Sequence, residues 1–383
     1  MAKKFIPYGT QSIDNGDIRA VSSVLRSEFL TQGPNVAEFE HKLAKYCKAK
    51  YAVAMNSGTS ALHAACFAAG IGKGDEVITS PITFVASANC VLYCGGTPAF
   101  ADIENDGSGL VSIDQIKKKI TPKTKAIIPV DYAGHPCDMD EINRIARKNG
   151  LIVIEDAAHS LGASYKGKKT GSLADMTILS FHAVKHITTG EGGAVLTNDK
   201  KYYDILLKFR THGITRAVKG PGPWYYEMQY LGFNYRITDF QCALGISQLK
   251  KLDRFIKIRK RIAAAYNKAF SHVDGISTPV EKDFATSSYH LYPIRIGKTL
   301  SRNKEQIFND LRAAGLGVNV HYIPVPLQPY YRKKFGFKKG DFPNAESFYE
   351  SEISLPLHQK MTQSDIDRVI KAVTDTINKW SKQ

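Results

Sequence analysis

The sequence predicts an α/β protein with a large domain built on a mostly parallel sheet and a smaller α+β domain. Short apolar, β-branched runs alternate with helix-like segments from about residue 38 to about residue 248, a pattern typical of parallel sheets covered by helices. Beyond residue 262 the alternation ends, and 383 residues exceed one usual hydrophobic core. We therefore expect a large domain over residues 1–250, including an N-terminal arm, and a small domain over residues 251–383.

Each expected strand is a short apolar run, and each expected helix has apolar residues at helical spacing. In the large domain we expect strands at 51–55, 76–80, 97–100, 126–130, 151–156, 176–179 and 194–197, and helices at 35–48, 58–69, 87–93 and 139–149. One long helix at 239–261, capped at Thr238, is expected to lead out of this domain. The small domain is expected to contain strands at 288–296 and 318–322, a helix at 304–314, and a last helix that begins near Thr362.

Lys185 is the first candidate for a catalytic residue. It lies in a turn rich in Gly and Thr, between the apolar runs 176–179 and 194–197. Partial burial disfavours the ammonium form and lowers the pKa of a lysine, and a neutral lysine can form a Schiff base with a carbonyl. The alternative is an ordinary surface lysine in a hairpin.

Asp156 ends the β-branched run 151–156, at the strand end where ligand-binding groups of parallel sheets gather. A carboxylate at this position can pair with the protonated ring nitrogen of pyridoxal phosphate. Glu155 could take this role instead, but alternation along a strand sends residues 155 and 156 to opposite faces. The alternative for Asp156 is a helix N-cap that follows the strand.

Residues 56–62 (NSGTSAL) follow a strand and begin an Ala-rich helix, which predicts a phosphate cradle around Ser57, Gly58 and Thr59. Ser180 could add another hydroxyl group to it. Helix capping alone would also explain this composition. Phe84 follows the strand at 76–80 and could stack on a planar ring, although a core position is the alternative.

These motifs resemble those of the DegT/DnrJ/EryC1/StrS family. The matching segments, in order along the chain, are 56–62 (NSGTSAL), 74–78 (GDEVI), 155–159 (EDAAH), 180–185 (SFHAVK), 190–193 (GEGG) and 232–236 (GFNYR). Within the family, residues 30–33 (LTQG) and 321–324 (HYIP) resemble the pseudaminic-acid branch.

The resemblance implies an aspartate-aminotransferase-like fold of type I with a seven-stranded sheet, and a transamination that depends on pyridoxal phosphate. Lys185 and Asp156 would be the catalytic residues. The same resemblance places His159 beside the phenolic oxygen of the cofactor and sends Asn234 to the phosphate of a neighbouring subunit, in a homodimer with shared active sites. The implied amino donor is glutamate, and the implied acceptor is a UDP-linked 4-keto-6-deoxy-N-acetylhexosamine.

By the same resemblance, the N-terminal arm lies near the active site, and a set of residues contacts the sugar nucleotide. This set is Tyr8, Glu28, Phe29, Leu30, Thr31, Ser57, Ser180, Asn234, Val320, His321, Tyr322 and Ile323. Ordinary core aromatic and strand residues are the alternative for each of them.

Bulk composition is compatible with such an enzyme. The net charge of +16 is dispersed and matches no nucleic-acid-binding module, so we expect no nucleic-acid partner; a positive field would attract a nucleotide diphosphate. No apolar run reaches membrane-spanning length, and Met1 to Lys4 carry no secretory signal. Six cysteines form no CxxC pair, so we expect reduced thiols, no metal site and a cytoplasmic protein.

Three other functions are alternatives to this one. A sugar dehydratase of the same family would carry histidine in place of Lys185. A non-catalytic nucleotide-binding regulator is disfavoured because residues 190–195 (GEGGAV) do not complete a dinucleotide-binding fingerprint. An aminotransferase for another keto-sugar, linked to dTDP or UDP and aminated at C3 or C4, stays open.

Overall fold

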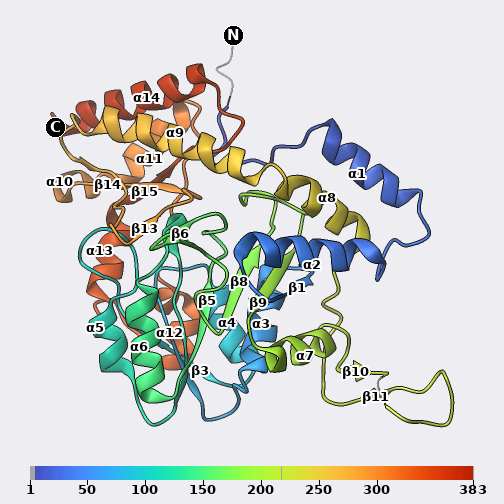
Figure 1. Cartoon of the computed structure of the whole chain (residues 1–383). Coiled ribbons are helices and arrows are strands. Elements are labelled where there is room, and N and C mark those ends of the chain that lie inside the picture. Colours follow the sequence, from blue (N-terminus) through green and yellow to red (C-terminus); the bar gives the residue numbers. More distant parts are fainter. Residues whose placement is uncertain (1–4, 217, 383) are drawn as a thin grey trace.

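The computed structural model describes residues 5–216 and 218–382, and its centre is a seven-stranded sheet in the order β1–β9–β8–β5–β4–β2–β3 (Figure 1). Only β9 runs antiparallel to its neighbours, β1 and β8. The predicted, mostly parallel sheet is therefore confirmed. The strands are β1 (Tyr51–Met55), β2 (Glu76–Thr79), β3 (Thr97–Phe100), β4 (Thr124–Ile128), β5 (Ile152–Asp156), β8 (Met176–Ser180) and β9 (Gly193–Thr197).

Helices cover both faces of this sheet because neighbouring strand residues point in opposite directions. In β5, Ile154 joins the apolar core under α3, α4 and α7, whereas Val153 joins the core on the other face. The first face carries α3 (Gly58–Ala68), α4 (Ala86–Tyr93) and α7 (Lys200–Phe209). The second carries α2 (Pro34–Cys47), α5 (Ile113–Lys119), α6 (Met139–Asn149) and α8 (Asp239–Leu249).

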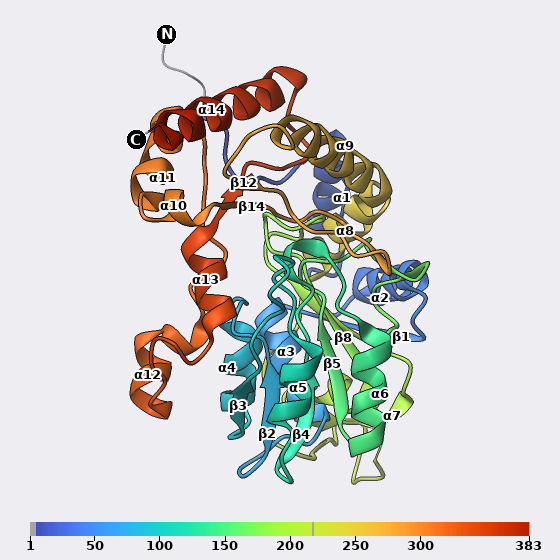
Figure 2. The same ribbon diagram turned by 90° about the vertical axis from the view of Figure 1, so that its left-hand side faces the viewer.

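A separate hydrophobic core lies beside the seven-stranded sheet and is built on a three-stranded sheet (Figure 2). Its strands are β12 (Ile276–Ser277), β14 (Tyr292–Ile296) and β15 (Glu352–Leu355). They pack against α9 (Leu252–Phe270), α11 (Lys304–Ala313) and α14 (Gln363–Ser381). Ile6 of the N-terminal arm also joins this core.

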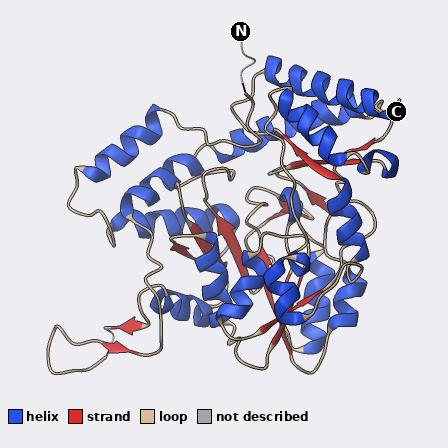
Figure 3. Cartoon of the chain, turned by 180° about the vertical axis from the view of Figure 1, so that it is seen from behind, coloured by secondary structure: helices blue, strands red, loops and turns tan. Residues whose placement is uncertain are grey.

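The remaining elements are short or peripheral, and the β10–β11 hairpin projects from the body of the molecule (Figure 3). They are α1 (Asn15–Leu25), η1 (Tyr132–Gly134), β6 (Ser164–Tyr165), β7 (Lys168–Lys169), β10 (Ile214–Thr215), β11 (Glu227–Met228), β13 (Ala285–Thr286), α10 (Lys298–Ser301), η2 (Val325–Leu327), α12 (Pro329–Phe335) and α13 (Pro343–Ser351). In the described part of the chain, no helix is long and apolar enough to cross a membrane.

The prediction of one helix at 239–261 is wrong, because the chain bends between α8 and α9. The helix is interrupted at Lys250 and Lys251, and Lys251 has φ −104° and ψ −6°. Its ammonium group pairs with Asp14 and Asp17 at the start of α1, at 2.9 and 2.6 Å. Leu252 is fully buried next to it. These contacts stabilise the bend. They cannot be predicted from the helical spacing of apolar residues, because their partners are distant in the sequence.

Two predicted strands of the small domain are also wrong in part. Residues 318–322 form only one bridge, between Asn319 and Ser354. The other strand, β14, begins only at Tyr292, and Tyr289 has φ 50°, outside the extended region. The chain then returns to the large sheet, since the segment 325–348 contributes five buried apolar side chains to the core around α5 and α6. A domain boundary at residue 250 stays a prediction.

Candidate functional site

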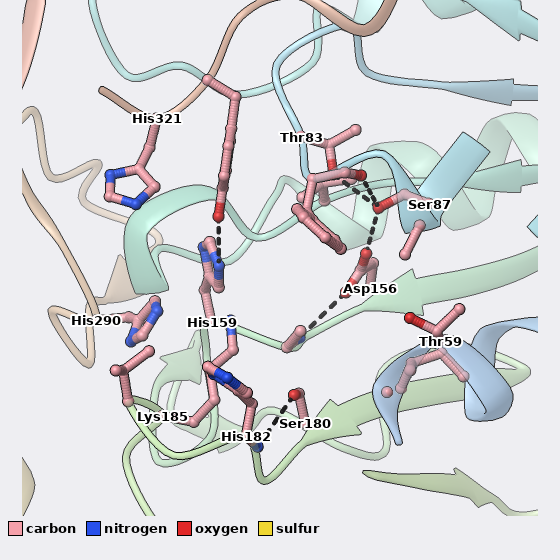
Figure 4. Close-up of a pocket in the computed structure, with 18 of the residues that line it drawn as sticks. Thr59, Thr83, Ser87, Asp156, His159, Ser180, His182, Lys185, His290 and His321 are labelled. Carbon is pink, nitrogen blue, oxygen red and sulfur yellow. Dashed lines mark hydrogen bonds between the residues drawn. The ribbon is translucent and has the colours of Figure 1, made fainter. Parts of the chain in front are cut away.

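A cavity of about 580 Å³ lies where β5 and β8 end, and Figure 4 shows most of the side chains that line it. Its wall comes from the first turn of α3, the segment after β2, the end of β5, the β8–β9 connection and the segment 319–322. Parts of both predicted domains thus meet at this cavity.

Asp156 lies at the end of β5 with its carboxylate in the cavity wall, and only 5% of the residue is exposed. It accepts hydrogen bonds from Ser87 Oγ at 2.5 Å and from the backbone N–H of Ala158 at 3.2 Å. Burial raises the pKa of Asp156, whereas these two bonds and Lys185 oppose the rise. Glu155 points the other way, into a bond with Thr177 at 2.8 Å, and does not line the cavity.

Lys185 lines the same cavity from the β8–β9 connection. Burial lowers the pKa of its ammonium group to about 8, and the negative charge of Asp156 opposes this shift. An amine with such a pKa is partly neutral near pH 7, unlike an exposed lysine. The structure therefore brings the two predicted catalytic groups to one cavity.

The predicted phosphate cradle forms the first turn of α3. Ser57 is its N-cap and exchanges hydrogen bonds with Ser60, so the Ser57 hydroxyl group is already engaged in the helix. Thr59 lines the cavity. Ser180 packs so closely that a Cβ on Gly58 would lie 3.1 Å from the Ser180 Cβ. A larger residue at position 58 would therefore have to displace Ser180 by a few tenths of an ångström.

Phe84 is a cavity residue and not a core residue, with 57% of its surface exposed. An exposed ring in a cavity wall is available for stacking on a planar ligand.

His159 lies beneath the segment 319–322, where its Nε2 is 3.2 Å from the hydroxyl group of Tyr322. Its Nδ1 is buried without a hydrogen-bond partner. Burial holds the pKa of His159 well below its ordinary value. His290 adds a second buried imidazole to the wall, 4.3 Å from the His159 ring centroid. Sequence reasoning missed His290 and Ser87, because neither belongs to a motif that suggests this chemistry.

The predicted substrate residues divide into two groups. Tyr8, Val320, His321 and Tyr322 line the cavity, so the N-terminal arm does reach the site. Ile323 does not line the cavity; it lies 46% exposed on the surface.

Glu28, Phe29, Leu30, Thr31 and Asn234 also lie outside the cavity of their own chain. All five are exposed on the surface. The segment 28–31 is anchored beside the start of α8, where Leu30 accepts a hydrogen bond from the backbone of Asp239. The backbone carbonyl of Asn234 accepts a hydrogen bond from the side-chain amide of Asn56 at 3.3 Å. Contact of residues 28–31 and Asn234 with a ligand therefore stays a prediction.

A family model described as the DegT/DnrJ/EryC1/StrS aminotransferase family matches residues 11–374. The chain belongs to the DegT/DnrJ/EryC1/StrS aminotransferase family.

Individual relatives agree with this assignment. The chain is 44% identical to a UDP-4-amino-4,6-dideoxy-N-acetyl-beta-L-altrosamine transaminase from Campylobacter jejuni over 377 residues, covering 97% of this chain and 96% of that one. The structure is similar to that of Helicobacter pylori PseC, an aminotransferase involved in the biosynthesis of pseudoaminic acid, with a TM-score of 0.92 and 35% identity over 98% and 100% of the two chains. A putative sugar aminotransferase from Streptococcus pneumoniae, solved in a PLP-form, has a TM-score of 0.92 and 32% identity over 98% and 99%.

Proposed function

We propose that this aminotransferase moves an amino group from glutamate to C4 of a UDP-linked 4-keto-6-deoxy-N-acetylhexosamine, in pseudaminic acid biosynthesis, with pyridoxal phosphate as cofactor. The observation that carries the proposal is the presence of Asp156 and Lys185 in one cavity wall with the exposed ring of Phe84. The name of the Campylobacter relative supports the choice of acceptor.

The residues of the cavity fit pyridoxal phosphate. Pyridoxal phosphate, when bound, supplies an electron sink for the negative charge that develops on the substrate. Asp156 would hold the ring nitrogen in its protonated form, and Phe84 would lie against the ring face. His159, whose Nδ1 has no protein partner, would lie near the phenolic oxygen. The phosphate would bind at the first turn of α3 with Thr59 and Ser180.

Lys185 would hold the cofactor covalently and, once released, move a proton at the substrate carbon that carries the amine. Proton transfer is most efficient when the pKa of the catalytic group lies near the working pH. The pKa of about 8 meets this requirement, whereas an ordinary lysine would be almost fully charged.

A homodimer would explain the position of the predicted residues that lie outside the cavity. Residues 28–31 and Asn234 would then act in the cavity of the second copy, with Asn234 at its phosphate. Large exposed apolar side chains within these segments and next to them in the chain support such an interface: Phe29, Leu30, Leu231 and Phe233.

Tyr8 and the segment 320–322 would contact the sugar of the acceptor, since they line the cavity opposite the α3 cradle. The net charge of +16 favours the approach of both the diphosphate and the dicarboxylic donor. Six free thiols, five of them buried, support the proposal of a cytoplasmic protein.

Covalent labelling tests the cofactor assignment. The full chain is incubated with pyridoxal phosphate, reduced with borohydride and digested, and the labelled peptide is identified by mass spectrometry. We expect a pyridoxyl group on Lys185 and none in Lys185→Ala. A label on a different lysine in the wild-type protein would refute the assignment.

A further inference from the structure

His321 is held in the cavity wall by four hydrogen bonds that use both its backbone and its ring. Its N–H donates to Glu352 Oε2 at 2.8 Å, and its carbonyl accepts from the hydroxyl group of Tyr132 at 2.6 Å. On the ring, Nδ1 lies 2.8 Å from Ser354 Oγ, and Nε2 lies 3.3 Å from Asn319 Nδ2. The backbone of His321 is therefore fixed, and its ring orientation depends on two polar neighbours.

Ser354 links the ring to a buried carboxyl group. Its hydroxyl group donates to Glu352 Oε1 at 2.5 Å, and both residues are fully buried in β15. A serine has a single hydrogen to donate. If that hydrogen goes to Glu352, the oxygen can only accept from the ring, so Nδ1 must carry the ring proton. The amide of Asn319 then donates to the unprotonated Nε2.

We propose that Glu352 is a positioning residue that, through Ser354, decides which ring nitrogen of His321 carries the proton in the cavity wall. Burial lowers the pKa of His321 to about 3, so the ring is neutral and its tautomer sets its hydrogen-bonding role. With ionised Glu352, Nε2 is an acceptor. With protonated Glu352 as donor to Ser354, Ser354 donates to Nδ1 and Nε2 carries the ring proton. Nε2 is then a donor, and the side-chain amide of Asn319 must turn to present its oxygen, because its NH₂ group cannot accept.

The charge of Glu352 is itself adjustable near working pH. Burial raises the pKa of its carboxyl group to about 8, against the bonds from Ser354 and His321 and the charge of Lys304 on α11. The other polar groups that face it are the hydroxyls of Tyr132 and Tyr322, whose pKa values are raised chiefly by burial and in smaller part by the charge of Glu352. Arg295 pairs with Glu352 in the β14–β15 register, but its guanidinium group lies beside Gly107.

The consequence for catalysis rests on the proposed function. A hydroxyl or N–H group of the sugar that replaces Asn319 as the donor to Nε2 requires the Nδ1–H tautomer, whereas a carbonyl oxygen of the sugar that accepts from Nε2 requires the other one. A mismatched buried hydrogen bond slows the acceptor half-reaction by about tenfold to a hundredfold. The glutamate half-reaction uses Lys185 and Asp156 and should be spared.

Glu352→Gln tests the proposal without a change of shape. Its amide oxygen accepts from the His321 N–H, and its NH₂ group can only donate to Ser354, which forces the Nε2–H tautomer. We would label the histidines of the full chain with ¹⁵N, identify the His321 ring signals by their loss in His321→Gln, and determine the tautomer at pH 6 and pH 9.5. Glu346→Gln is the matched control, because Glu346 is also buried but binds the backbone of Gly340 and Phe342.

We expect Nδ1–H in the wild type and in Glu346→Gln at pH 9.5, and Nε2–H in Glu352→Gln at both pH values. The same tautomer in the wild type and Glu352→Gln at pH 9.5 would overturn the proposal. If Glu352→Gln does not fold, Ser354→Ala serves instead. The wild type should change its His321 tautomer between pH 6 and pH 9.5, and loss of the Ser354 hydroxyl group should abolish this change. The same change of tautomer in Ser354→Ala would overturn the proposal. These signals do not depend on the identity of the sugar, so a wrong acceptor assignment would leave them intact.

Discussion

Replacement of Lys185 by methionine should stabilise the protein prepared without cofactor, because the folded chain must otherwise hold a partly desolvated ammonium group on a half-buried residue. Folding lowers the pKa of Lys185 from 10.5 to about 8. Below pH 8 Lys185 carries its proton in both the folded and the unfolded chain, but binds it less favourably in the folded chain. This difference lowers the free energy of unfolding by at most about 3 kcal/mol at pH 7. As pH rises from 8 to 10.5 the folded chain loses the proton first, so this cost declines and amounts to about 1 kcal/mol at pH 10.

Urea denaturation at pH 7 and pH 10 measures the difference directly, with each variant compared with the wild type at the same pH. Lys333→Met is the matched control, since Lys333 is exposed on α12 and should change stability by less than about 0.5 kcal/mol. We expect Lys185→Met to be more stable than the wild type at pH 7 and to lose most of this advantage at pH 10. An advantage that is absent at pH 7, or equal at both pH values, would refute the desolvation argument.

Three further predictions concern activity. Asp156→Asn should fold but lower turnover by about a hundredfold or more, because a neutral amide cannot stabilise the protonated ring nitrogen; near wild-type turnover would assign the role to another carboxylate. Substitution of His321 or Tyr8 by alanine should slow the acceptor half-reaction in single-turnover spectroscopy and leave the glutamate half-reaction largely intact, whereas equal damage to both would contradict a sugar-specific role. Mixed dimers of Lys185→Ala with an inactive Asn234→Ala chain should regain part of the activity, and no recovery after proven subunit exchange would place Asn234 in its own subunit's site.

Local sequence patterns predicted the sheet, and they predicted that Asp156 and Lys185 lie together, because both features follow from residues that are close in the sequence. Alternation along β5 separates Asp156 from Glu155, and the structure places only Asp156 at the cavity. The loop between β8 and β9 carries Lys185 to the same place, since neighbouring strands of one sheet end close together. The capping pattern at Thr238 likewise marks the start of α8 correctly.

Features that depend on distant contacts could not be predicted in this way. The bend at Lys251 needs carboxylates of α1, more than 230 residues earlier in the chain. Phe84 has an apolar side chain like those of core residues, and only the arrangement of the elements around it leaves its ring exposed. His290 and Glu352 act through neighbours from other segments, so neither has a local signature.

The central claim is most directly tested by the position of the amine in the product. The purified protein, with pyridoxal phosphate and glutamate, would be given a panel of UDP- and dTDP-linked 3-keto and 4-keto sugars, and each product would be examined by NMR. We predict preferred turnover of the UDP-linked 4-keto-6-deoxy-N-acetylhexosamine with the new amine on C4. Selective turnover of a dTDP-linked 3-keto sugar would contradict the proposed function.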